Sequence, residues 1–397
     1  MLNYGVKSGP DGRHTAGFPA DSRAGAKEMY RSFTIKNFRC FDELTVEGMG
    51  RINLIAGKNN VGKTALLEAL WVHHGKVNPD LCSRIESFRG LEQLNPERFL
   101  ANIFYSFDRR LSIVLSAEGS WQDTPRDLTM WIEDPSSFEI PLRDTEGSHL
   151  DTQTSASRIL RSSDVVVMEY STASEVPIRS KGRLVERQPD HRTREVGIEM
   201  FYQEGQPSNG HPTGVLLTGR RPSVSNEDVK RFSDLEVQNS QNSIVEILQE
   251  VEPKLKRLAV VSIGVTPTIY AETGIGRLIP LQLLGDGMSR IFSFALAIAS
   301  APGGIVLVDE IENGIHHSVM EKVWKAIGAF ARSYDVQLFA TTHSYECISA
   351  AYRAFEADEE DELRLFRIEK NGQGEYKAVK FDRERLKSVL DFNMEVI

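Results

Sequence analysis

A glycine-rich segment between a largely apolar run and a helix-forming run constrains this chain more than any other feature. Residues 57–64 read Gly-Lys-Asn-Asn-Val-Gly-Lys-Thr, after the run 52–56 and before Ala-Leu-Leu-Glu-Ala-Leu. Such spacing of the two glycines lets successive backbone N–H groups point inward at phosphate oxygens, and the positive end of the following helix adds to the attraction. The segment therefore predicts a phosphate-binding loop between a strand and a helix.

The residues of this loop are expected to bind a nucleoside triphosphate, and two of them have specific roles. Lys63 would bridge the β- and γ-phosphates, and Thr64 would ligate Mg²⁺. A glycine turn with a surface lysine is the alternative, and the flanking strand and helix weigh against it. The expected nucleotide-binding residues are Gly57, Lys58, Asn59, Asn60, Val61, Gly62, Lys63 and Thr64.

Composition and charge limit the class of protein. The 397 residues are 40% hydrophobic, which allows one large core or two smaller ones in a soluble protein. A formal net charge of −9 does not indicate a general binder of polyanions, although it leaves room for a local basic face. The most apolar stretch, residues 291–299, is too short for a membrane helix, so we expect no membrane partner. The widely spaced Cys40, Cys82 and Cys347 predict free thiols, mostly buried, in a reducing, cytoplasmic location.

The pattern along the chain predicts an α/β fold with a mixed sheet, an antiparallel β-lobe and a short helical insertion. We expect a disordered tail at 1–29, with Met29 as an alternative translation start. A first lobe at 30–141 carries the phosphate-binding loop (Walker A), a partly helical lid forms an insertion at 142–257, and a second lobe spans 258–397. Expected strands are 32–38, 43–46, 51–55, 111–116, 127–132, 164–170, 196–202, 258–265, 268–271, 305–308, 337–341, 363–369 and 375–381, with helical segments at 226–256, 288–300, 315–333 and 345–355.

Two adjacent carboxylates follow the apolar run 304–308. Asp309 would orient the ligands of Mg²⁺ (Walker B), and Glu310 would polarise an attacking water molecule. Strand ends often turn into polar loops, so two acids alone are weak support. Their position after a phosphate-binding loop favours the catalytic interpretation.

A histidine and a glycine-rich turn complete the set of motifs. The strand 337–341 leads into Thr-His-Ser, which places His343 at the carboxyl edge, where ligands of parallel sheets bind. We expect His343 to contact the γ-phosphate, with an ordinary polar contact as the alternative. The segment Leu-Gly-Asp-Gly-Met-Ser-Arg at 284–290 begins a helix and could offer backbone N–H groups to an anion, unless it is a plain loop.

The order of these motifs resembles that of the ABC-type ATPase heads of the RecF, SMC and OLD families. The segments GKNNVGKT, LGDGMSR, LVDEIENGIHHSV and FATTHS are most similar to those of compact prokaryotic AAA family ATPases related to OLD proteins. The resemblance implies a P-loop NTPase of the ABC-ATPase head type that hydrolyses ATP with Mg²⁺. It also implies a homodimer in which the signature of one subunit, Gly285, Asp286, Gly287 and Ser289, caps the ATP of the other.

Carried over onto the matching motifs, the resemblance assigns catalytic roles to Lys63, Glu310 and His343, and metal binding to Thr64 and Asp309. Residues 312–314 would join the two active sites across the dimer, with a capped helix start as the alternative. Arg39, after the first strand, would help to hold the nucleotide, or it is a surface arginine.

Several features depart from the family pattern. Gly285 stands where transporter signatures carry serine, Asp286 adds a negative charge, and no glutamine loop is identifiable. Too few residues follow His343 for the Toprim nuclease of many OLD-like proteins, so a nuclease would be a separate polypeptide. The acidic run 358–362 reads as a solvated linker.

The leading functional hypothesis is a dimerising, ATP-hydrolysing switch coupled to DNA or to an effector protein, in genome maintenance or phage defence. An ATP-binding scaffold with little turnover is the alternative that Asp286 favours, and a transporter subunit is a weaker one. Basic residues near the middle of the chain could contact DNA phosphates, or they form a solvated loop. These are Arg179, Lys181, Arg183, Arg187, Arg192 and Arg194.

Overall fold

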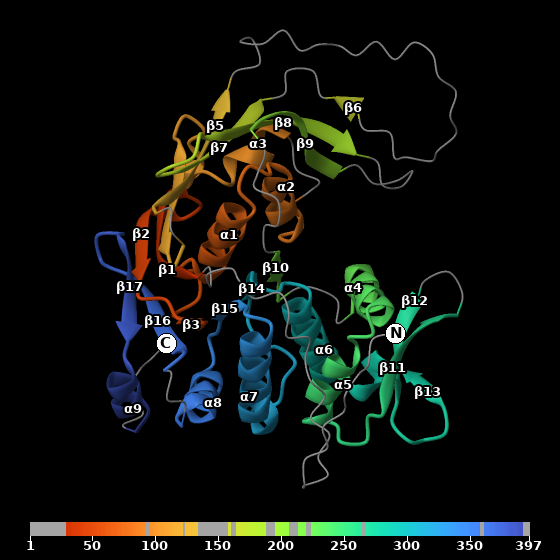
Figure 1. Cartoon of the computed structure of the whole chain (residues 1–397). Helices are drawn as coiled ribbons and strands as arrows, with labels where there is room; N and C mark the ends of the chain where they lie inside the picture. Colours follow the sequence, from red (N-terminus) through yellow and green to blue (C-terminus); the bar gives the residue numbers. More distant parts are fainter. Residues whose placement is uncertain are drawn as a thin grey trace, which may run out of the picture.

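A largely parallel sheet and an antiparallel sheet enclose one helix in the computed structural model (Figure 1). The structure describes residues 29–391 except 92–95, 122–123, 134–157, 160–163, 188–194, 206–212, 220–223, 264–266 and 358–360. The expected disordered tail therefore lies outside the described residues, apart from Met29.

The parallel sheet supplies the edge at which the predicted motifs meet. Its strands follow the order β10-β14-β15-β3-β16-β17, parallel except for the β16–β17 hairpin. Alternate residues of one central strand enter different cores: Ile305 and Leu307 on one face, Val306 and Val308 on the other. Burial on both faces explains why this strand is uniformly apolar. The bounds are β3 Ile52–Ala56, β10 Gly214–Leu217, β14 Ile305–Val308, β15 Gln337–Thr341, β16 Leu363–Lys370 and β17 Tyr376–Phe381.

Helices cover both faces of the parallel sheet. One face packs against α6 (Asp286–Ala299), α7 (His317–Ser333) and α8 (Tyr345–Phe355), with α9 (Arg383–Asp391) beside α8. The other face packs against α1 (Lys63–His74), whose buried leucines also touch the antiparallel sheet. The N-terminus of α1 is thereby fixed between two layers.

The antiparallel sheet is the predicted β-lobe. Its strands follow the order β2-β1-β4-β5-β7-β8-β6, and β9 pairs with β8. The helices α2 (Asp80–Ser87) and α3 (Pro96–Ala101) lie nearby in Figure 1. The bounds are β1 Tyr30–Phe38, β2 Phe41–Glu47, β4 Ile113–Gly119, β5 Arg126–Glu133, β6 Arg158–Ile159, β7 Val165–Thr172, β8 Ile178–Arg187 and β9 Glu195–Glu204.

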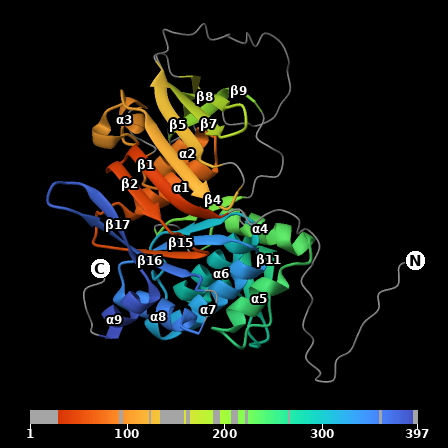
Figure 2. The same cartoon turned by 60° about the vertical axis from the view of Figure 1, so that its left-hand side comes forward.

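Within the described residues, the segment 142–257 contributes to both sheets. β7, β8 and β9 extend the antiparallel sheet, and β10 pairs with β14. The helices α4 (Asn226–Val237) and α5 (Asn242–Gln249), with the small sheet β11 (Arg257–Ser262), β12 (Pro267–Glu272) and β13 (Leu278–Pro280), pack beside α6 (Figure 2). The domain boundaries themselves remain a prediction.

The interpretation of the basic segment as a solvated loop was wrong for residues 179–183, which lie on β8. Arg179 Nε lies 3.0 Å from Glu169, Lys181 Nζ 2.9 Å from Glu133, and Arg183 3.3 Å from Glu199. Cross-strand carboxylates therefore neutralise these cations. The side chain of Arg187, and the whole of Arg192 and Arg194, lie outside the described residues.

His73, near the C-terminus of α1, makes the stability of the fold depend on pH. Its Nδ1 lies 2.9 Å from the hydroxyl of Tyr30, and its Nε2 lies 2.9 Å from the carbonyl oxygen of Arg126. Burial lowers the pKa of His73 from 6.5 to about 3. In the unfolded chain His73 takes up a proton as the pH falls below 6.5, whereas in the folded chain it stays neutral until the pH approaches 3. The contribution of neutral His73 to stability is therefore complete above pH 6.5 and is lost as the pH falls toward 3.

We expect the titration of His73 to lower the free energy of unfolding by about 2 kcal/mol as the pH falls from 7 to 5. Urea unfolding of the wild type and of His73→Gln at both pH values measures this contribution, because other titrating groups are common to the two proteins. The variant should be less stable at pH 7 but lose about 2 kcal/mol less on acidification. An identical pH dependence of the two proteins would contradict the assignment.

Candidate nucleotide site

The phosphate-binding loop needs glycine at both of the predicted positions. Gly57 and Gly62 have φ of 140° and 93°, in the region that other residues rarely adopt. A Cβ on Gly62 would also lie 2.4 Å from Phe41 and 2.7 Å from the sulfur of Cys40. The turn between β3 and α1 is therefore set by backbone conformation and by close packing.

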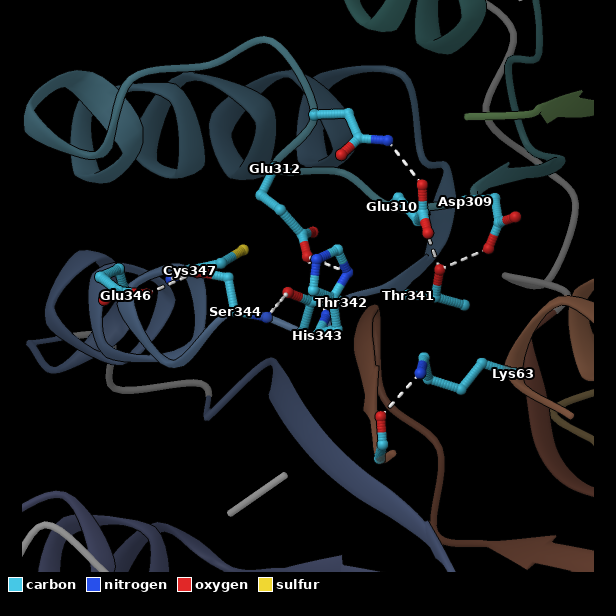
Figure 3. Close-up of polar contacts among 12 residues, drawn as sticks. Lys63, Asp309, Glu310, Glu312, Thr341, Thr342, His343, Ser344, Glu346 and Cys347 are labelled. Atoms are coloured by element: carbon cyan, nitrogen blue, oxygen red, sulfur yellow. Dashed lines mark hydrogen bonds and ion pairs between the residues drawn. The ribbon is translucent and has the colours of Figure 1, made fainter. Parts of the chain in front are cut away.

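The side-chain nitrogen of Lys63 lies against the backbone of this loop. Its Nζ donates to the carbonyl oxygens of Gly57 at 2.6 Å and Lys58 at 3.0 Å, and Figure 3 shows one of these contacts. Burial lowers the pKa of Lys63, while the nearby Asp309 raises it. The ammonium group thus lies at the first residue of α1, where the positive end of the helix also attracts anions.

Thr341, at the end of β15, bonds to the carboxylate of Asp309 and to the backbone of Glu310. Its Oγ1 donates to Asp309 Oδ1 at 2.6 Å and accepts from the backbone N–H of Glu310 at 2.8 Å (Figure 3). From the loop side, Thr64 Oγ1 lies 3.1 and 3.0 Å from the two carboxylate oxygens of Asp309. The carboxyl ends of β3, β14 and β15 therefore meet in one hydrogen-bonded group.

The oxygen atoms of Thr64 and Asp309 fit Mg²⁺. This ion prefers hard oxygen ligands and is commonly held by one or two protein groups together with substrate phosphates. Among the described residues no group of three or more His, Cys, Asp or Glu side chains could hold a metal ion, so a site built entirely from such side chains is not indicated there. Burial raises the pKa of Asp309 despite the hydrogen bonds from Thr341 and Thr64. A nearby cation would relieve that cost.

Glu310 occupies a constrained position beside this group. Its φ is 51°, and its Oε2 accepts from the side-chain amide of Asn313 at 2.6 Å. A Cβ on Gly219 would lie 2.9 Å from the same oxygen, so any side chain there would have to displace this carboxylate. A positive φ at a non-glycine residue is costly and is typical of functional sites.

His343 is held by a single glutamate. Glu312 Oε1 accepts from the backbone N–H of His343 at 2.8 Å and lies 3.1 Å from its Nδ1 (Figure 3). The other carboxylate oxygen of Glu312 is buried without a hydrogen-bond partner. Because the His343 side chain remains 46% exposed, its ring can reach a group outside the chain.

A pocket of about 950 Å³ extends from the loop to a mixed aromatic and basic wall. The phosphate loop contributes Asn59, Asn60, Gly62, Lys63, Thr64 and Ala65, and the acidic strand end contributes Asp309 and Glu310. Its other described lining residues are Arg39, Cys40, Arg89, Leu91, Asn102, Phe104, Tyr105, Ser106, Phe107, Lys370, Gly374 and Tyr376. The signature residues 285–289 are not among them.

Residues 52–349 match the family model described as "AAA domain, putative AbiEii toxin, Type IV TA system". The matched segment begins at β3 and ends in α8, so it contains every motif of the site. The chain belongs to this AAA domain family. The predicted membership of the AAA family is thereby confirmed.

Known proteins resemble this AAA domain at low sequence identity. An ATP/GTP phosphatase of Helicobacter pylori is 22% identical over 363 residues, which cover 87% of this chain and 94% of that protein. A structure of the SMC head bound to the C-winged helix domain of ScpA is 11% identical with a TM-score of 0.47, covering 90% of this chain and 99% of that chain. The SMC head domain from Thermotoga maritima is 12% identical with a TM-score of 0.40, covering 89% and 99%.

Arg39 lines the pocket of the AAA domain, but its side chain is only 8% exposed, so the surface alternative was wrong. It forms ion pairs with Glu68 at 3.0 Å and Glu86 at 2.5 Å. Arg89 lies 2.8 Å from Glu68 on the other side. These four residues form a charge network beside the pocket, buried except for Arg89, whose side chain is 38% exposed. The sequence did not reveal this network because its members are far apart in the chain.

The signature segment of the AAA domain begins α6 away from the pocket. Gly285 has a φ of 101°, and nothing lies within 4 Å of where its Cβ would be. Arg290, further along the helix, donates to the carbonyl oxygen of Glu310 at 3.3 Å. The start of α6 is thus open on its outer side and connected to the acidic strand end on its inner side.

None of the helices in the described ranges is long and apolar enough to cross a membrane. Cys40, Cys82 and Cys347 are free, and the last two are buried, as expected from their spacing.

Proposed function

We propose that this AAA domain hydrolyses ATP with Mg²⁺ and that nucleotide binding controls its dimerisation. One observation carries the proposal: Thr64, Asp309, Thr341 and Glu310 form one hydrogen-bonded group at the mouth of the phosphate-binding loop. The similarity to the Helicobacter pylori ATP/GTP phosphatase supports triphosphate hydrolysis and makes GTP a second substrate to test.

Each group of residues in the site has a separate role in the proposed reaction. Backbone N–H groups of residues 57–64 and the ammonium group of Lys63 bind the phosphates. Thr64 and Asp309 would hold Mg²⁺, which would neutralise charge at the phosphate oxygens when bound. Glu310, oriented by Asn313, accepts a proton from the attacking water, and His343, oriented by Glu312, contacts the γ-phosphate.

The signature residues act in trans in this proposal. Gly285, Asp286, Gly287 and Ser289 lie outside the described lining of the pocket of their own chain, and Gly285 is open to its surroundings. A second copy would therefore bring its α6 to the nucleotide, which gives a homodimer. The carboxylates paired with Arg179, Lys181 and Arg183 favour a separate effector protein, such as a nuclease, over DNA contact at β8.

Calorimetry with Mg–ATP tests binding at this site. Replacing Lys63 with alanine should weaken ATP binding about 10- to 150-fold, since a charge-assisted hydrogen bond is worth about 1.5–3 kcal/mol. Lys325→Ala, at an exposed lysine of α7, serves as the matched control and should bind as the wild type does. Absence of Mg-dependent ATP uptake by the wild type would overturn the proposed function.

A further inference from the structure

Phe107 is an exposed aromatic side chain in the wall of the nucleotide pocket. It is 68% exposed, yet it lines the same cavity as Lys63 and Thr64. A large ring left in water forgoes the stabilisation that burial would give. An aromatic residue kept exposed beside a ligand pocket is therefore a candidate for contact with the ligand.

The backbone around Phe107 is held in an unfavourable conformation. Ser106 and Phe107 have φ of 52° and 59°, in a region that non-glycine residues seldom occupy. The preceding residues anchor the loop: Phe104 is buried and bridges to Phe38, and Arg39 donates to the carbonyl oxygen of Asn102 at 3.0 Å. The packed frame thus fixes the turn that presents Phe107.

The other aromatic residues of the pocket wall are engaged within the protein or less exposed. Phe104 is 2% exposed, and Tyr105 is half-buried. The ring of Tyr376 packs edge-on against Phe41 at 5.0 Å, and Lys370 Nζ lies 5.0 Å from its centroid. Among the described lining residues, Phe107 is therefore the aromatic side chain best placed to receive a second ring.

We propose that Phe107 is the surface on which the purine base of the bound nucleotide stacks. The inference rests on the proposed function, since it takes the triphosphate to lie on the phosphate-binding loop, which lines the same cavity. Stacking on an aromatic face tolerates any purine, because every base has a π-face. The side-chain amide nitrogen of Asn102, also in the wall, is engaged by Glu86 at 3.0 Å. Phe107 therefore contributes affinity for ATP and GTP alike.

Titration calorimetry of the full chain with Mg–ATP, Mg–GTP and Mg–tripolyphosphate tests the inference. Phe107→Ala should weaken ATP and GTP about 5- to 150-fold, the usual range for loss of one base stack, and should change tripolyphosphate affinity less than about twofold. Phe107→Trp, which restores a larger ring, should bind both nucleotides at least as tightly as the wild type. Val176→Ala, at an 86% exposed residue outside the pocket, is the matched control.

Failure of this inference can be told apart from failure of the proposed function. Wild-type affinity of Phe107→Ala for ATP, or an equal loss for ATP and tripolyphosphate, would overturn the stacking role while leaving triphosphate binding intact. No binding of any of the three probes by the wild type would overturn the proposed function and the inference with it.

Discussion

Replacing Glu310 with glutamine should lower the turnover number for ATP by a factor on the order of 10²–10⁴ while leaving Mg–ATP affinity unchanged. The amide retains an oxygen that can accept the hydrogen bond of Asn313, so the side chain should keep its place. It cannot take a proton from water at neutral pH. The expected loss therefore falls on the chemical step alone.

Phosphate release under saturating ATP, together with calorimetry, measures the two quantities separately. Glu321→Gln, at a glutamate of α7 paired with Lys325 and Arg353, should hydrolyse ATP at the wild-type rate. Wild-type turnover by Glu310→Gln would rule out the role of Glu310 as base. A wild type that binds ATP without measurable turnover would instead support the scaffold alternative.

Asn313→Ala provides a graded companion to that experiment. It removes the donor 2.6 Å from Glu310 Oε2 but leaves the carboxylate in place. Its turnover should therefore fall by less than that of Glu310→Gln.

Much of the parallel sheet could be predicted because its strands carry a local signal. The run at β14 is apolar on both faces, and β3 leads directly into a loop whose glycines are required by backbone geometry. Expected and observed bounds of β14 and β15 coincide. Parallel strands present their carboxyl ends at one edge, so the strand assignments alone placed Lys63 and Asp309 in one pocket and His343 at the same edge of the sheet, outside the described lining of that pocket.

The links within the site could not be predicted, because they depend on which strands are neighbours. Thr341 joins Asp309 to Glu310 only because β15 lies beside β14, and the chain separates them by about thirty residues. Glu312 was expected at a dimer contact, yet it also holds His343 within its own chain. Neither contact leaves a spacing pattern in the sequence.

Two charged segments were interpreted incorrectly from the sequence, because their ion-pair partners lie elsewhere in the chain. β8 reads as a polar basic segment, but Arg179, Lys181 and Arg183 face carboxylates on β7, β5 and β9. The acidic run 358–362 reads as a solvated linker, yet the side chain of Glu362 is 7% exposed and contacts Arg51 and Arg332. Residues 358–360 of that run lie outside the described ranges. The local composition shows which charges a segment carries. Whether those charged side chains are buried depends on the strand that pairs with the segment.

Replacing Arg39 with alanine should reduce the free energy of unfolding by about 3–5 kcal/mol in the absence of nucleotide. The side chains of Glu68 and Glu86 are 3% and 0% exposed, so neither can regain full hydration when the guanidinium group is removed. Arg89 would still compensate Glu68, and Asn102 would still donate to Glu86. The carboxylate of Glu86 would nevertheless remain buried without a cation that pairs with it.

Urea unfolding of matched variants separates this penalty from a general loss of packing. Arg39→Ala combined with Glu86→Gln should recover part of the stability, because the uncompensated charge is removed with its partner. Arg84→Ala, which breaks an exposed pair with Asp80 on α2, should cost about 0.5 kcal/mol or less. If Arg39→Ala were no more destabilising than Arg84→Ala, the network would not support the loop. A large loss without rescue by Glu86→Gln would indicate that the aliphatic part of Arg39 matters more than its charge.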